Sequence, residues 1–112
     1  MDCVFCKIAQ KELPTDIVYE DDNIIGFKDI APEAPIHLLF IPKKHLEWKD
    51  NFNNDDLSLL SNLINRAKVV AKEKNILDAC KLIFNIGKTG DITHIHLHLL
   101  GGWTKNVPKY NI

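Results

Sequence analysis

The sequence predicts an α+β fold: a five-stranded antiparallel sheet with one long helix and one short N-terminal helix. Three observations predict it: short apolar or alternating stretches, one long stretch with apolar residues every three or four positions, and the order of these stretches. The strands come in groups before and after the long helix and do not alternate with helices. This order favours an antiparallel sheet over alternating βαβ units. The 112 residues are expected to form a single domain, 1–112.

The long helix has the clearest periodicity. Its apolar positions fall at three- and four-residue steps from Leu57 to Ala71, and the polar run 53–56 supplies N-cap candidates. The loop 31–35 carries two prolines, which make it rigid, and Pro42 ends the strand that follows. In order, the expected elements are a short helix over 3–11, strands over 17–20, 24–29 and 36–41, a long helix ending near 75, and strands over 81–86 and 94–100.

Composition narrows the classes of function. The formal net charge is −1, and acidic and basic residues are interspersed, which argues against a duplex nucleic-acid binder. The longest apolar stretches, such as 38–41, are far shorter than the about 20 residues of a membrane helix, and no signal-type segment is visible. The protein is therefore expected to be cytoplasmic, without a membrane partner. Three cysteines in such a chain favour thiols or a metal over a disulfide framework.

Three histidines alternate with apolar residues at His94, His96 and His98. In a strand such residues share one face, and imidazoles are poor core fillers. A neutral imidazole can attack phosphorus, and protonated neighbours can neutralise phosphoryl oxygens or protonate a leaving group. Phosphoryl or nucleotidyl transfer suits the row best. Hydrogen-bonded structural histidines and a metal site remain alternatives, although neighbours two apart on a strand are poorly spaced to chelate one ion.

The run from His94 to Leu100 resembles the motif of the histidine triad (HIT) family. Further segments resemble the nucleoside-phosphoramidase branch of that family. The resemblance implies a purine nucleotide ligand of the AMP type and a homodimer in which two sheets continue into one. The further segments are 5–8, 19–21, 27–30, 34–37, 41–45 and 99–102.

The same resemblance implies roles for individual residues. His96 would attack the α-phosphate and form a nucleotidyl-histidine, from which water releases a nucleoside monophosphate without any cofactor. His98 would contact the phosphate and the leaving group, and His37 would support the nucleophile. Asn85 would bond near the phosphate, and Asp29 would accept from the ribose hydroxyls. The apolar cleft around the purine would comprise residues that could equally be plain core: Phe5, Ile8, Phe27, Ile30 and Leu39.

A C-x-x-C pair, Cys3 and Cys6, lies at the N-terminus and is a weak signal alone. By resemblance to bacterial HIT proteins, His45 and His94 would complete a structural Cys₂His₂ zinc site. The alternative is a pair of reduced cysteines packed as small apolar residues. Cys80 has no partner in the sequence and is expected in the core.

Two segments depart from the family pattern. The loop 86–93 is shorter than usual, with Asp91 where a serine is common, and main-chain amides of Thr89 and Asp91 would contact phosphate. The tail 103–112 lacks the usual Trp-Pro-Pro-Gly ending and is expected to pack on the body or at the dimer interface. The leading hypothesis is a hydrolase of nucleoside 5′-phosphoramidates. A nucleotide-binding regulator with weak or vestigial catalysis is the alternative, and a zinc-binding interaction module would leave the histidine row unexplained.

Overall fold

The computed structural model describes residues 3–87 and 92–109. The five strands form one antiparallel sheet in the order β1-β2-β3-β5-β4, so the predicted α+β architecture is confirmed. The elements follow the predicted order: α1 (Val4–Ala9), β1 (Ile17–Glu20), β2 (Ile24–Lys28), β3 (Ile36–Pro42), α2 (Asn54–Glu73), β4 (Cys80–Phe84) and β5 (Leu97–Gly101).

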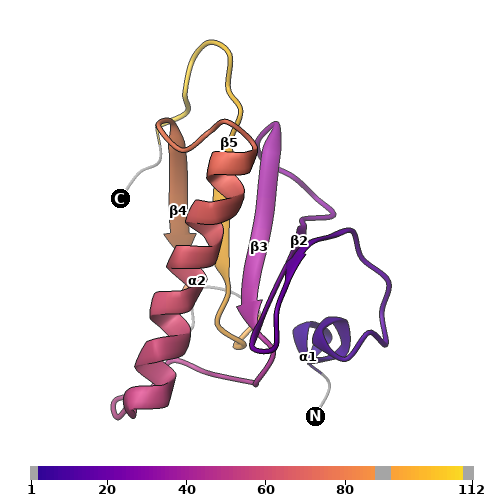
Figure 1. Ribbon diagram of the computed structural model, residues 1–112, viewed down its shortest axis with the longest axis vertical. Coiled ribbons are helices and arrows are strands. Elements are labelled where there is room, and N and C mark those ends of the chain that lie inside the picture. The colour runs from indigo at the N-terminus through magenta and orange to yellow at the C-terminus, as the bar shows by residue number, and fades with distance from the viewer. Residues whose placement is uncertain (1–2, 88–91, 110–112) are drawn as a thin grey trace.

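Helix α2 lies across one face of the sheet (Figure 1). Its buried residues Leu63, Ala67 and Val70 recur at helical spacing and pack in one apolar cluster with residues of β3 and β5. Asn53 caps the helix: its side chain accepts from the Asp56 N–H, and the Asp56 carboxylate accepts from the Asn53 N–H. Among the described residues, no helix is both long enough and apolar enough to cross a membrane.

The opposite face of the sheet carries α1. Successive side chains of a strand point to opposite faces, so alternate residues of β2 and β3 reach the two helices. On β3, Leu38 and Phe40 join the α2 cluster, whereas Leu39 and Ile41 pack with Phe5 and other residues of α1. Apolar residues are therefore needed on both faces, which explains why β3 is almost continuously apolar.

A close approach across the sheet requires a glycine in β2. Gly26 pairs with Phe40 of β3, and a Cβ at Gly26 would lie 2.6 Å from a carbon of the Phe40 ring. The Phe40 side chain is fully buried. The glycine thus makes room for the largest core side chain of the central strand.

Strand β5 begins at Leu97, so the prediction of a strand from 94 was wrong for its first three residues. The reason is a change of hydrogen-bond partner: the Ile95 N–H donates to the Leu46 carbonyl at 2.8 Å instead of to a neighbouring strand. The alternation of faces nevertheless continues through this segment. Ile95 joins the α2-side core with Leu97, while His96 faces the α1 side.

Candidate functional site

A cavity of about 380 Å³ opens between α1 and the sheet. Its walls are mainly apolar, and two histidines of the row, His96 and His98, face it together with the Asp29 carboxylate. All five residues expected around the purine line it: Phe5, Ile8, Phe27, Ile30 and Leu39. Four of them are buried, whereas Ile30 is 95% exposed and belongs to the rim. Leu13, Pro14 and Ile92 also line the cavity and were not predicted, because no periodicity distinguishes them.

A main-chain carbonyl fixes the tautomer of His96. Nδ1 of His96 lies 2.9 Å from the carbonyl oxygen of His94, and a carbonyl can only accept, so Nδ1 carries the proton. In the neutral ring Nε2 then keeps its lone pair. The Phe5 ring packs edge-on against the imidazole, with centroids 5.2 Å apart. The ring is therefore held with one unprotonated nitrogen at a pocket wall.

His37, on β3, contacts the third histidine of the row. Nε2 of His37 lies 2.8 Å from Nδ1 of His98, and the ring centroids are 5.1 Å apart. The hydrogen bond of His37 thus joins it to His98 and not to His96. Burial, together with the neighbouring His96 and His37, lowers the pKa of His98 to about 4, against the opposing effect of the Asp29 charge.

Two polar residues flank the histidines. Asp29 accepts from the Ala31 N–H through Oδ1 at 2.9 Å, and its Oδ2 lies 3.4 Å from Nε2 of His37. Asn85 follows the end of β4, and its amide nitrogen Nδ2 lies 3.4 Å from Nε2 of His98. Asp29 and Asn85 therefore both lie beside the histidine row. The expected phosphate contacts Thr89 and Asp91 lie outside the described residues.

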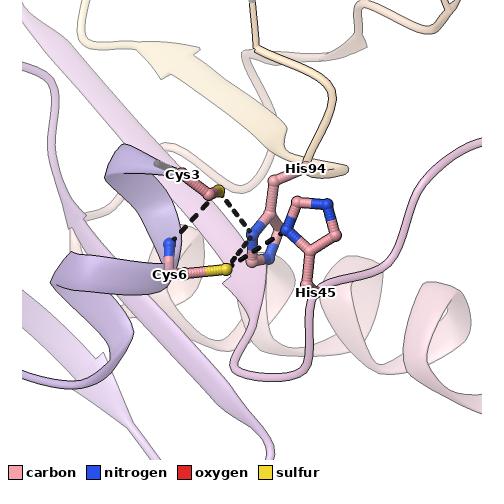
Figure 2. A group of neighbouring side chains, drawn as sticks. All are labelled: Cys3, Cys6, His45 and His94. Carbon is pink, nitrogen blue, oxygen red and sulfur yellow. Dashed lines mark hydrogen bonds between the residues drawn. The ribbon is translucent and has the colours of Figure 1, made fainter. Parts of the chain in front are cut away.

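The two cysteines of the C-x-x-C pair meet two histidines on the same side of the sheet (Figure 2). Cys3 caps α1, and its sulfur accepts from the Cys6 N–H. Sγ of Cys3 lies 3.4 Å from Nδ1 of His94, and Sγ of Cys6 lies 3.2 Å from Nδ1 of His45 and 3.6 Å from that of His94. All four donor atoms lie within 4.8 Å of one another.

The donor set fits a tetrahedral zinc ion. Zinc–ligand bonds of about 2.0–2.3 Å place tetrahedral ligands about 3.3–3.8 Å apart, close to the separations between these sulfurs and nitrogens. The remaining ring nitrogens are engaged elsewhere: Nε2 of His94 donates to the Pro42 carbonyl at 2.8 Å, and Nε2 of His45 to the Glu47 carboxylate at 2.7 Å. In the neutral rings both Nδ1 atoms are thereby left with lone pairs. Burial also lowers the pKa of His94 to about 4, which keeps its ring neutral.

Two residues around this cluster were not predicted from the sequence. Glu47 receives hydrogen bonds from His45 and from the Thr93 hydroxyl, the latter at 3.2 Å. Thr93 precedes His94, and Glu47 lies two residues after His45, so the only signal was proximity in the chain to the expected ligands. Cys80, in contrast, packs at the edge of the α2-side core, as expected.

Comparisons with known proteins agree with this architecture. Residues 2–107 match the family described as scavenger mRNA decapping enzyme C-term binding. Protein HitA of Neisseria gonorrhoeae is 41% identical over 101 residues, which cover 88% of this chain and 94% of that protein. The 14 kDa zinc-binding protein of Brassica juncea is 38% identical over 111 residues, or 96% of this chain and 98% of that protein. A HIT family hydrolase from Legionella pneumophila Philadelphia 1 has a TM-score of 0.86 and 46% identity, with 96% of this chain and 98% of that chain covered. The chain therefore belongs to the histidine triad (HIT) family.

Proposed function

We propose that the protein hydrolyses nucleoside 5′-phosphoramidates, or related nucleotidyl substrates, through a covalent intermediate on His96. The observation that carries the proposal is the tautomer of His96: its Nδ1 proton is held by the His94 carbonyl, and Nε2 is free at the wall of an apolar pocket. An imidazole nitrogen with a free lone pair is a competent nucleophile at phosphorus near neutral pH. A solved relative of the same fold is named a hydrolase, which supports the reaction class.

The pocket suits a purine nucleoside. Its volume of about 380 Å³ falls within the range of small-molecule sites, and its apolar walls would cover the two faces of a base. Asp29 uses one lone pair of Oδ1 for the Ala31 N–H, and a carboxylate has about four such positions, so others remain for the ribose hydroxyls. The base would then lie against Phe5 and Phe27, with the α-phosphate toward His96.

The reaction would run in two displacements. In the first, Nε2 of His96 forms a bond to the α-phosphorus while the P–N bond of the substrate breaks. Its electron pair stays on the amine nitrogen, which takes up a proton from the medium and leaves. In the second, water attacks the phosphorus, loses a proton to the medium, and the bond to Nε2 breaks with its electron pair returning to the ring. The products are an amine and a nucleoside monophosphate, and no cofactor takes part in these steps.

The test is AMP release from an adenosine 5′-phosphoramidate. The wild-type protein should turn the compound over, and His96→Ala should lower kcat by a factor on the order of 10³ or more, since the nucleophile is lost. Lys68→Ala, on the exposed face of α2, is the matched control and should behave as wild type. Mass spectrometry of protein quenched early in the reaction should find the nucleotidyl group on the peptide that contains His96.

Two outcomes would contradict the hydrolase. Turnover that His96→Ala leaves unchanged would remove His96 from the chemistry. Tight AMP binding by the wild-type protein without turnover of any phosphoramidate would favour the regulatory alternative, in which the same pocket senses a nucleotide.

We further propose that the Cys3, Cys6, His45 and His94 cluster holds a structural zinc ion. The support is the donor set itself, two sulfurs and two Nδ1 lone pairs at tetrahedral spacing, together with a relative named for zinc binding. A closed site with four protein ligands leaves no open position for substrate, so the ion would stabilise the fold and take no part in the displacement at phosphorus.

Elemental analysis of protein purified without a metal-affinity tag tests the zinc proposal. About one equivalent of zinc per chain is expected, as for other sites with four protein ligands. Cys6→Ala should lose the metal and Cys80→Ala should keep it. A content below about 0.2 equivalents in the wild-type protein would dismiss the site.

A further inference from the structure

The two ring nitrogens of His37 are fixed from opposite sides. Nδ1 accepts a hydrogen bond from the main-chain N–H of Glu33 at 3.0 Å, so it cannot carry a proton itself. Nε2 faces an obligatory acceptor, Oδ2 of Asp29, at 3.4 Å as well as Nδ1 of His98 at 2.8 Å. Both sides therefore require the same state of His37, with its proton on Nε2.

This state of His37 determines the state of His98. Because His37 donates through Nε2, Nδ1 of His98 must accept, and in the neutral ring the proton of His98 lies on Nε2. Nε2 is also the nitrogen that lies 3.4 Å from Nδ2 of Asn85. Two N–H donors cannot bond to each other, so this tautomer of His98 requires the Asn85 amide to be rotated by 180°, with Oδ1 in place of Nδ2. Asn85 would then accept from Nε2 until a substrate replaces it.

We propose that His98 serves the reaction as a neutral hydrogen-bond donor, with its Nε2–H held toward the substrate through His37 by the main-chain N–H of Glu33. The proposal rests on the proposed function and names how one residue of that site acts. A neutral imidazole can polarise a reacting group by donating a hydrogen bond. His98 would thus donate to a phosphoryl oxygen or to the departing atom without transferring its proton.

Proton uptake by this pair would break one of its hydrogen bonds. A proton on Nδ1 of His98 would point at the N–H of His37, and moving the His37 proton to Nδ1 would oppose the N–H of Glu33. Of the charged and titratable groups that face His98 among the described residues, the His96 and His37 rings oppose a cation and Asp29 favours one. The His37 side chain is only 2% exposed, so water cannot readily replace a lost bond.

NMR of ¹⁵N-labelled protein prepared with zinc shows the tautomer and the charge of His98 directly. Two-bond ¹H–¹⁵N correlations distinguish the two neutral tautomers and the cation, and a His98→Gln spectrum assigns the signals. We expect the Nε2–H tautomer from about pH 8 down to about pH 5, with AMP absent or bound, whereas an ordinary histidine titrates near 6.5. A proton on Nδ1, or a titration midpoint near that ordinary value, would overturn the proposal.

The part of Glu33 is tested separately. A scalar coupling across the hydrogen bond should connect the Glu33 amide with Nδ1 of His37 in the wild-type protein. Glu33→Pro removes the N–H and should raise the His98 midpoint by about one pH unit or more, while Glu33→Ala keeps the N–H and should leave the tautomer unchanged. If the coupling is absent, the Glu33 N–H does not fix the tautomer of His37. That conclusion holds even if the proline variant fails to fold.

Failure of this proposal differs from failure of the proposed function. Finding the Nε2–H tautomer of His98 without turnover of phosphoramidates would refute the hydrolase. The hydrogen bonds from Glu33 through His37 to His98 would still stand. Turnover with a His98 that titrates near neutral pH would retain the hydrolase and make His98 an acid, against the present proposal.

Discussion

Each of the five histidines has at least one ring nitrogen held by a neighbouring group, and that contact decides which nitrogen carries the proton in the neutral ring. In the row, the Pro42 carbonyl turns Nδ1 of His94 toward the cysteines, and the His94 carbonyl leaves Nε2 of His96 to the pocket. His98 instead receives a hydrogen bond from another ring. Three histidines with the same sequence spacing thus acquire three different roles from main-chain and side-chain partners.

Glu47 is expected to strengthen metal binding through His45. Its carboxylate accepts from Nε2 of His45 at 2.7 Å, which orients the ring and increases the basicity of Nδ1. Glu47→Gln removes the charge but keeps a side chain of the same shape, and should weaken zinc binding by about 10–100-fold. Competition with a chromophoric chelator measures the change in Kd.

Asp50→Asn is the matched control for Glu47→Gln, because it removes an exposed carboxylate from the same connection between β3 and α2. It should leave the Kd for zinc unchanged. Equal affinities for Glu47→Gln and wild type would show that the carboxylate does not act on the metal through His45.

The residues of the candidate site could be predicted from the sequence, but the hydrogen bonds between them could not. Alternation in the row and the resemblance pointed to the histidines, the cysteines and Asp29. The contact from Glu33 to His37 depends on how the loop 31–35 turns back on β3, which no local pattern encodes. Glu47 was missed for a similar reason, since an exposed glutamate carries no periodic signal.

At the scale of elements, Asp21 organises the turn between β1 and β2. Its carboxylate accepts from the N–H groups of Asn23 and Ile24, both at 2.8 Å, and from the Tyr19 hydroxyl at 2.7 Å. Arg66 of α2 donates to it at 3.1 Å. Burial disfavours the charged carboxylate, but these donors outweigh burial and lower the pKa of Asp21 to about 2. The turn and the long helix are thereby connected through one anion.

Asp21→Asn should destabilise the protein in a pH-dependent manner. The folded-state pKa lies below the unfolded value of about 3.9, so this group stabilises the fold fully above about pH 5 and progressively less as pH falls toward 2. Allowing for partial exposure, we expect a loss of about 1–2 kcal/mol in the free energy of unfolding at neutral pH, and a smaller loss near pH 3. Urea unfolding in the presence of a chelator, at both pH values, measures it.

Asp22→Asn provides the comparison, because Asp22 is an exposed neighbour in the same turn. It should change the free energy of unfolding little at either pH. If Asp21→Asn and wild type lost stability in parallel as pH falls, the hydrogen-bonded carboxylate would not be the source of the effect.

The elements themselves were largely predictable because most of them carry a strong local pattern. The helical spacing from Leu57 to Ala71 predicted α2, and the polar run before it contained the actual N-cap, Asn53. The error at the start of β5 has a tertiary cause. The hydrogen bond from Ile95 to the Leu46 carbonyl joins segments far apart in the chain, and alternation alone cannot reveal it.

At the scale of the whole molecule, the sheet has two outer strands, β1 and β4. An outer strand offers unpaired main-chain groups to another chain. Leu82 of β4 is a large apolar side chain that is 43% exposed, and a second copy of the chain would cover it in a dimer formed at this edge. The homodimer with a continuous sheet, and a place for the tail 103–112 at its interface, remain predictions that a measurement of molar mass in solution would test.

The proposed zinc ion would connect three parts of the molecule that are distant in sequence: α1 through Cys3 and Cys6, the segment after β3 through His45, and the segment before β5 through His94. A ligand that binds only the folded state stabilises it by about 2.7 kcal/mol at 100 times its Kd, so a chelator should lower the unfolding midpoint. Because α1 is short, it should open first, and its amides should exchange hydrogen faster than those of α2. Cys6→Ala should unfold at the same midpoint with and without chelator, whereas Cys80→Ala should retain the difference. A wild-type midpoint that the chelator leaves unchanged, with the metal shown to be removed, would mean that packing of Phe5 and Ile8 holds α1 without the ion.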